Sequence, residues 1–308
     1  MKANKIKKVF LGSRGEGGLL RRIIIYIILI GISFIYLYPI LRMLALSFMG
    51  LEDLNDSQVN WIPTTMMLSN YVKAFQALNY MKALGNSLLV SVIPTICILL
   101  SSSLVGYGLA KYRFRGRTFI LIMCVVNFVL PTVLLSIPNY VLYNRLGLID
   151  TLWSYILPAL FGFGLRESLF ILIFFQFFRI IPHDLYEAAE IDGCNEIKMF
   201  FVVAIPLSVT AFLICGLYSF VWYFNETTMA SMFLKQNYKT LAQALISFNE
   251  TYARKFPTGK ATGADANTFN QGVLFSGTLL SILPLIIVYA FTQRWFIDGI
   301  DKSGLAGQ

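Results

Sequence analysis

Long apolar runs alternate with short polar connections along most of the chain, and this pattern predicts membrane-spanning helices. A helix needs ~20 apolar residues to cross a bilayer, and six runs approach or exceed that length. We expect a polar tail at 1–22, a membrane domain at 23–297 and a second tail at 298–308. The predicted spans are residues 23–47, 87–109, 118–142, 154–178, 200–224 and 273–295.

The fourth predicted span contains Pro158, Arg166 and Glu167, and two interpretations of it stay open. In the first, both charges lie near the bilayer centre and face an aqueous path, as ionisable groups at that depth usually do. In the second, residues 154–164 form an irregular re-entrant piece, a regular helix starts near Leu165, and both charges lie near the outside. Adjacent side chains point about 100° apart on a helix, so the two charges need not pair.

Two other segments stand out from the apolar pattern. Small residues at 101–103, Gly106 and Gly108 form a stripe in the second span that suits close helix packing in lipid. Residues 225–271 are polar and too long for an ordinary connection, because loops of that length are usually functional or disordered. This segment is therefore either a contact surface outside the membrane or a linker.

Composition and charge support a membrane protein and give its orientation. The chain is 57% hydrophobic and 13% charged, with mean hydropathy +0.67, whereas soluble domains carry about 25% charged residues. The net charge of +9 is concentrated in the tail at 1–22 and the loop Lys111–Arg117, which the span count places on one side. That side is the cytoplasm by the positive-inside rule, so both termini are expected there. This pattern favours membrane lipid over nucleic acid as a partner, and the first run is interpreted as a span rather than a signal peptide.

The chain lacks the residues that several other chemistries require. His183 is the single histidine, the four cysteines have no metal or disulfide spacing, and no phosphate-binding loop occurs. An intramembrane enzyme would need a nucleophile–base or metal constellation, and an ion-driven transporter would need embedded carboxylates in internal repeats. Beyond Glu167 neither is found, so we expect a non-catalytic protein with no cofactor and no metal.

The polar loop at 182–207 predicts a short helix outside the lipid. Asp184 and Glu187 are spaced as an N-cap and an N3 acid, and Pro182 stands where a helix start tolerates it. Gly193 predicts the end of the helix, because glycine alone adopts the left-handed C-cap at little cost. The helix would be roughly 12 Å long. A charged helix of this kind cannot lie in lipid, so we expect it to lie flat on the membrane surface and to dock onto a partner.

The spacing within this loop resembles that of a known family. Glu187-Ala188-Ala189, three residues, Gly193, nine residues and then Val203-Ala204-Ile205-Pro206 are similar to the EAA loop of ABC-importer permeases. The family pattern ends in Ile-x-Leu-Pro, so Val203 and Ile205 are a mild departure. Ile191-Asp192-Gly193 resembles the carbohydrate branch, similar to the second permease of maltose and oligosaccharide importers. Ser69-Asn70-Tyr71, Gly85-Asn86-Ser87 and residues 293–307 extend the resemblance to nearly the whole chain after the first span.

The resemblance implies an all-α membrane protein, a six-transmembrane-helix type I ABC-importer permease bundle in a bacterial cell membrane. It implies uptake of sugars of oligosaccharide size, driven by ATP hydrolysis on separate subunits. The implied partners are a second homologous permease, two cytoplasmic ATPase subunits that bind the ATP, and an extracellular sugar-binding protein contacting residues 225–271. An ABC permease for a non-sugar solute is the alternative. The residues implied in ATPase docking are Glu187, Ala188, Ala189, Asp192 and Gly193.

Two predicted spans contain candidate residues for the sugar path: the charged pair in the fourth span and the aromatic and polar residues at the end of the fifth. Sugars are bound by aromatic faces with hydrogen-bonding groups nearby, and the fifth span ends in such a group of residues. The competing interpretation is an ordinary aromatic belt at the membrane interface. The candidates are Arg166, Glu167, Trp222, Tyr223 and Asn225.

Overall fold

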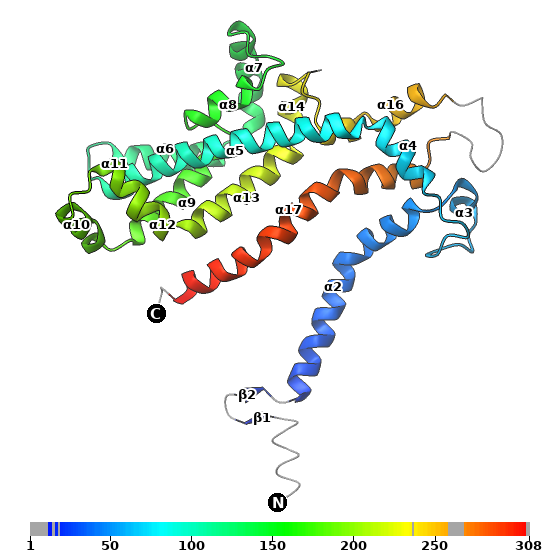
Figure 1. Ribbon diagram of the computed structural model, residues 1–308, viewed down its shortest axis with the longest axis horizontal. Coiled ribbons are helices and arrows are strands. Elements are labelled where there is room, and N and C mark those ends of the chain that lie inside the picture. Colours follow the sequence, from blue (N-terminus) through cyan, green and yellow to red (C-terminus); the bar gives the residue numbers. More distant parts are fainter. Residues whose placement is uncertain (1–11, 14–15, 18, 236, 258–267, 306–308) are drawn as a thin grey trace, which may run out of the picture. The chain divides into compact units, whose positions relative to one another are not determined.

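The computed structural model describes residues 12–13, 16–17, 19–235, 237–257 and 268–305, and most of them are helical (Figure 1). The only sheet in this described part pairs two-residue strands, β1 (Gly12–Ser13) and β2 (Glu16–Gly17), in antiparallel fashion. The chain divides into two compact units. The first comprises Met1–Ala74 and Ala253–Leu279, and the second comprises Phe75–Tyr252 and Leu280–Gln308.

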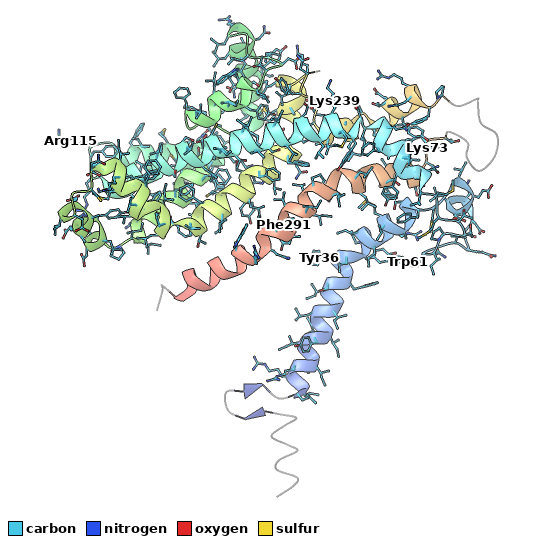
Figure 2. All side chains as sticks on the ribbon, viewed as in Figure 1. Tyr36, Trp61, Lys73, Arg115, Lys239 and Phe291 are labelled. Carbon is cyan, nitrogen blue, oxygen red and sulfur yellow. The ribbon has the colours of Figure 1, made fainter. Side chains whose placement is uncertain are left out.

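The first unit is built on a long apolar helix, α2 (Leu19–Ser47), followed by the short helix α3 (Leu51–Asn55). Most side chains of α2 are exposed in this single chain, and Tyr36, labelled in Figure 2, is 76% exposed. Apolar side chains exposed on all sides of a helix belong in lipid or against another protein. The helix thus fits the first predicted span, extended at its start to Leu19.

A tight corner closes the first unit where α4 (Ser69–Ala77) and α17 (Gln271–Leu305) begin. The Asn70 side chain donates from Nδ2 to the carbonyls of Ser47 (3.0 Å) and Met49 (2.9 Å). A Cβ added to Gly272 would lie 2.5 Å from the Met49 oxygen, so only glycine fits there. The asparagine of the Ser69-Asn70-Tyr71 sequence therefore holds the end of α2 against the start of α17.

Helix α5 (Tyr80–Lys111) is the axis of the second unit. It runs beside α9 (Glu167–Ile180) and α13 (Val209–Asn225), as Figure 1 shows. The small-residue stripe predicted in this helix does allow close packing, because a Cβ on Gly106 would lie 2.7 Å from the Phe174 Cβ. Gly108 has open space beside it, so only one of the two glycines makes the close approach.

Three of the predicted spans are bent rather than continuous. Residues 118–142 divide at Pro131 with a bend of 96°, because Leu130 precedes a proline and takes the extended conformation. Residues 154–178 divide into α8 and α9, separated by irregular backbone at 161–166. The pieces are α6 (Arg117–Val129), the 3-10 helix η1 (Thr132–Leu135), α7 (Ser136–Arg145), α8 (Trp153–Leu160) and α9.

The third bend, of 80°, falls at Ser208 in the predicted fifth span. Before it lie α11 (Glu196–Met199), a π-helical turn η2 (Phe200–Ala204) and α12 (Ile205–Leu207). Pro206 has no N–H for a helical hydrogen bond, and the Ser208 hydroxyl donates to the Ala204 carbonyl at 2.6 Å. The Val203–Pro206 part of the loop sequence thus produces a turn rather than the continuous helix expected from residue 200.

Among the described residues, three helices are long and apolar enough to cross a membrane, namely Leu19–Ser47, Tyr80–Lys111 and Gln271–Trp295. The number rises to six if each bent pair of helices is counted as one span. The helical fold is therefore confirmed, with three to six candidate spans.

The polar segment at 225–271 is partly helical. It carries α14 (Thr228–Phe233), α15 (Leu241–Ile246) and α16 (Phe248–Lys255), while residues 258–267 lie outside the described residues. Asn86 Nδ2 donates to the carbonyls of Asn237 (3.3 Å) and Lys239 (3.1 Å), and Ser87 Oγ accepts from the Leu241 amide at 2.8 Å. The segment up to α15 is thus anchored on α5 and is not a bare linker.

Candidate functional site

The predicted docking helix is present as α10 (His183–Ile191), bent 74° from α9. It begins after Pro182, but the expected N-capping is wrong: Asp184 lies inside the first turn, and no side chain caps the helix start. Glu187 instead contacts the ring of His183, with 3.0 Å between Oε1 and Nδ1. The proline and the extended Ile181 before it, rather than a side-chain cap, fix where the helix starts.

The end of α10 follows the prediction. Gly193 has φ +77°, and its amide donates to the Glu190 carbonyl at 3.0 Å. The Cys194 amide donates to the Ala189 carbonyl, also at 3.0 Å. These two bonds form a Schellman motif, in which the left-handed residue is glycine because a Cβ would be strained there.

The residues predicted to dock an ATPase form an exposed surface on α10 and the turn after it. Glu187, Ala188, Asp192 and Gly193 are exposed, and Ala189 is half-buried. A Cβ on Gly193 would meet nothing within 4 Å, so space beside it is open. The apolar side chain of Ile191 next to this surface is 87% exposed. Acidic, small and apolar side chains of α10 are thus open to solvent in the single chain.

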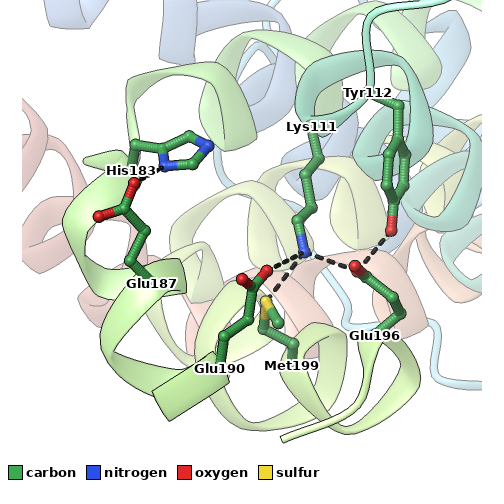
Figure 3. Close-up of polar contacts among 7 residues, drawn as sticks. All are labelled: Lys111, Tyr112, His183, Glu187, Glu190, Glu196 and Met199. Atoms are coloured by element: carbon green, nitrogen blue, oxygen red, sulfur yellow. Dashed lines mark hydrogen bonds and ion pairs between the residues drawn. The ribbon is translucent and has the colours of Figure 1, made fainter.

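The inner side of the same region holds a lysine that sequence reasoning did not select. Lys111 Nζ lies 2.6 Å from Glu196 Oε2 and 3.9 Å from Glu190 Oε1 (Figure 3). The Tyr112 hydroxyl also donates to Glu196. Burial raises the pKa of Tyr112 to about 12, and its hydrogen bond to Glu196 acts in the same direction, so the hydroxyl stays protonated at neutral pH. In the sequence, Lys111 was only one member of a basic loop.

A second candidate site is a cavity of about 530 Å³ in the second unit, lined by residues of α6, η1, α7, α8, the start of α9, the end of α13 and α14. Three of the five predicted path residues, Arg166, Glu167 and Tyr223, line it. Trp222 and Asn225 are not among its lining residues. Further lining side chains with hydrogen-bonding groups are Asn127, Asn139, Tyr143, Tyr155 and Glu226.

Arg166 and Glu167 are held by different neighbours. Arg166 has φ +53°, and its Cζ lies 4.8 Å from the centre of the Trp222 ring. Glu167 is 1% exposed and accepts hydrogen bonds from the Gly164 amide (2.6 Å) and the Ser101 hydroxyl. The regular helix starts at Glu167, close to the start at Leu165 in the second interpretation of this span, although residues 153–160 are helical rather than irregular.

The remaining path candidates have local roles. Tyr223 is buried, and its phenolic oxygen accepts the Leu165 amide at 3.1 Å, which fixes the chain just before Arg166. The exposed Asn225 donates from Nδ2 to the carbonyl of Val221 in its own helix, at 3.1 Å. Within the described part of the chain, no group of three His, Cys, Asp or Glu side chains is placed to hold a metal ion.

Long apolar helices joined by an exposed, acidic short helix are typical of an integral membrane protein. The chain belongs to the family described as binding-protein-dependent transport system inner membrane component, which matches residues 102–302. It is therefore the membrane permease component of an ABC importer and is not itself an enzyme, as the resemblance implied.

Curated relatives match the chain over most of its length. The arabinooligosaccharides transport system permease protein AraQ of Halalkalibacterium halodurans is 29% identical over 90% of this chain and 93% of its own length. The polygalacturonan/rhamnogalacturonan transport system permease protein YtcP of Bacillus subtilis is 30% identical over 92% of this chain and 97% of its own. Among solved structures, a chain of a bacterial ABC transporter involved in import of the acidic polysaccharide alginate has the same fold. It has a TM-score of 0.71 and 22% identity, covering 91% of this chain and 99% of that chain.

Proposed function

We propose that the chain is the transmembrane subunit of a sugar importer and moves oligosaccharides into the cytoplasm. The observation that carries this proposal is full-length similarity to relatives named for transport of arabinooligosaccharides and of polygalacturonan and rhamnogalacturonan. Uptake of a panel of labelled oligosaccharides, amino acids and peptides into proteoliposomes that hold the complete transporter tests it. Uptake of peptides or amino acids without uptake of any saccharide would favour the non-sugar alternative.

The proposed site of ATPase docking is the exposed surface of α10 with Glu187, Ala188, Ala189, Asp192 and Gly193. Its support is their exposure and the open space beside Gly193. Loss of one partner of an interfacial ion pair costs ~2–5 kcal/mol, so Glu187→Lys should weaken co-purification of the ATPase. Gly193→Trp should do so by obstructing the surface. Glu52→Lys, on exposed α3 in the first unit, is a matched control. Unchanged co-purification and uptake in both docking variants would overturn the assignment.

The proposed assembly pairs this chain with a second, homologous permease and two cytoplasmic ATPase subunits in a bacterial cell membrane. Six spans with both termini in the cytoplasm would combine the three long helices, the bent pairs at 117–145 and 196–225, and α9 with α8 before it, while α10 lies outside the lipid. ATP is bound by the ATPase subunits, and this chain needs no cofactor. Sugar uptake by this chain with an ATPase and a binding protein but without a second permease would contradict the assembly.

The proposed cycle is conformational. Closure of the two ATPase subunits on ATP carries the docked helices with it and rocks the permeases between inward-open and outward-open states. An external binding protein delivers the sugar. The cavity lined by Arg166 and Glu167 is the proposed part of the sugar path within this chain, because it joins aromatic faces to hydrogen-bonding groups.

A further inference from the structure

The ammonium group of Lys111 lies where three helical elements meet. Its side chain is 8% exposed, and its carboxylate partners come from α10 (Glu190, 3.9 Å) and α11 (Glu196, 2.6 Å). Met199 of α11 adds a contact of 2.9 Å between Nζ and Sδ (Figure 3). Since Lys111 is the last residue of α5, one side chain joins the end of that helix to both helices of the docking loop.

Aromatic faces surround the same ammonium group. Its Nζ lies 5.2 Å from the ring centre of Tyr186, 5.6 Å from Tyr112 and 5.8 Å from Tyr107. A cation within about 6 Å of a ring face is attracted by the negative charge of the face. The hydroxyls of Tyr107 and Tyr186 are buried without a hydrogen-bond partner in the described part of the chain. Tyr107 and Tyr186 therefore contact the ammonium group through their ring faces rather than through their hydroxyls.

The acids of the docking loop divide into two groups. Glu187 contacts His183 and is 64% exposed, whereas Glu190 and Glu196 contact Lys111. Asp184 and Asp192 are exposed. The Glu190 and Glu196 side chains are also 55% and 54% exposed, so what sets this pair apart is its contact with Lys111, which attaches the loop to α5.

A second set of contacts on α5 lies about 15 Å from Lys111, since ten residues separate Lys111 from Ser101 at a rise of ~1.5 Å per residue. Ser101 donates to Glu167, which lines the cavity. The Ala159 carbonyl of α8, 2.6 Å from Ser101 Oγ, is an alternative acceptor for the same hydroxyl. A continuous helix thus connects the docking loop to the wall of the cavity.

The simpler explanation for Lys111 is a membrane-orienting positive charge. Such a side chain reaches outward to water or lipid headgroups. Arg113 and Arg115 in the following loop are exposed in that way, and Arg115 is labelled in Figure 2. Lys111 instead points inward and is enclosed, so orientation alone does not explain its placement.

We propose that Lys111 is a positioning residue that fixes α10 and α11 to the end of α5, so that movement of the docking helix moves α5 and the cavity wall. This inference rests on the proposed docking of an ATPase at α10. Loss of the lysine charge should leave the exposed docking surface in place but let the loop move without α5.

The test uses the complete transporter in proteoliposomes and compares Lys111→Met with Lys111→Arg and with the exposed control Arg115→Met. We expect Lys111→Met to lower sugar uptake per ATP hydrolysed by roughly fivefold or more, the lower end of typical coupling between sites. The ATPase should still co-purify. Amide hydrogen exchange in peptides covering 183–195 should become faster. Lys111→Arg should restore most of the coupling, because it keeps the charge, and Arg115→Met should match the parent.

An uptake-to-ATP ratio in Lys111→Met equal to that of the parent would overturn the inference. If Lys111→Met fails to assemble, Glu196→Gln provides a second test, because it removes one of the two carboxylates that contact Lys111 from a half-exposed side chain. An uptake-to-ATP ratio in Glu196→Gln equal to that of the parent would overturn the inference equally. Failure of the docking proposal gives a different result: Glu187→Lys and Gly193→Trp would then leave co-purification unchanged. Even if the docking proposal fails, amide hydrogen exchange in peptides covering 183–195 of Lys111→Met reports whether the lysine holds the loop in place.

Discussion

Arg166 and Glu167 are consecutive residues, yet the Arg166 guanidinium stacks on Trp222 of α13 while the Glu167 carboxylate accepts the Ser101 hydroxyl of α5. The left-handed backbone at Arg166, with φ +53°, turns the chain between α8 and α9 and separates the two side chains. One helix start thereby contacts two neighbouring helices through opposite charges.

Arg166 should affect the sugar path and Asn225 should not. Arg166 lines the cavity, whereas Asn225 lies outside it and is bonded to its own helix. We expect Arg166→Ala to change the rate or selectivity of uptake across a panel of oligosaccharides, with assembly intact. Asn225→Ala should transport the panel as the parent does. Parental transport by Arg166→Ala would place the path elsewhere, for instance in the partner permease.

Removal of the Glu167 acceptor should destabilise the second unit. Glu167→Leu leaves the part-buried Gly164 amide without this acceptor, at a cost of about 1–3 kcal/mol for an unsatisfied group, while the Ser101 hydroxyl keeps the Ala159 carbonyl as an acceptor. Glu167→Gln keeps an acceptor oxygen and should cost less. Thermal unfolding in detergent measures the difference, and equal midpoints for the two variants would argue against the role of these hydrogen bonds.

The two glycines of α5 should respond differently to the same change. A Cβ at Gly106 would lie 2.7 Å from the Phe174 Cβ and 3.0 Å from the Phe175 amide nitrogen. Overpacking of this kind costs about 1–3 kcal/mol, so Gly106→Ala should lower the unfolding midpoint. Gly108→Ala, two residues along and facing open space, is the matched control and should be neutral or slightly stabilising. Equal unfolding midpoints for the two variants would mean that α5 and α9 move apart at little cost to make room for the added methyl group.

The cost of substituting Gly193 should depend only on how readily the new residue adopts the left-handed backbone conformation. No atom lies within 4 Å of an added Cβ, so the cost comes from the φ of +77°. Gly193→Val should destabilise the end of α10 by roughly 1–2 kcal/mol, and Gly193→Asn by less, because asparagine visits this conformation more readily. Hydrogen exchange of the Gly193 and Cys194 positions reports the difference. Similar exchange in both variants would contradict the importance of the Schellman motif.

The polar segment after α13 should contact the sugar-binding protein. Shortening Lys255–Asn267, most of which lies outside the described residues, should weaken stimulation of the ATPase by that protein without disturbing α15, which is anchored at Ser87. The loop length favours this role over that of a passive connection. ATPase assays with and without binding protein test it, and full stimulation of the shortened variant would favour a linker.

The sequence was sufficient where local rules decide the structure. Gly193 ends the docking helix, and small residues in α5 mark a close helix crossing, because backbone conformation and side-chain volume act within a few ångströms. A proline in an apolar run marks a kink point, as at Pro131, but the bend at Ser208 was not predicted. Apolar runs measure the length that can lie in lipid, but they do not determine the direction in which the chain continues.

The contacts of Lys111 were beyond sequence reasoning for a different reason. Its partners Glu190 and Glu196 are distant in the chain, and only the packing of α10 and α11 on α5 brings them together. Glu187 was assigned to the helix cap because its spacing fits that role, yet the His183 ring is a competing partner one turn away. Sequence spacing therefore suggests one possible contact for a charged side chain, whereas the packing of the folded chain determines which contact forms.

The contact between His183 and Glu187 has a practical consequence for spectroscopy. His183 is the single histidine among 308 residues, and its side chain is 74% exposed in the first turn of α10. Isotope labelling of histidine alone therefore gives one set of imidazole resonances from this chain, and that set comes from the docking helix. The protein carries a native magnetic-resonance probe at the surface where its motor subunit is proposed to bind.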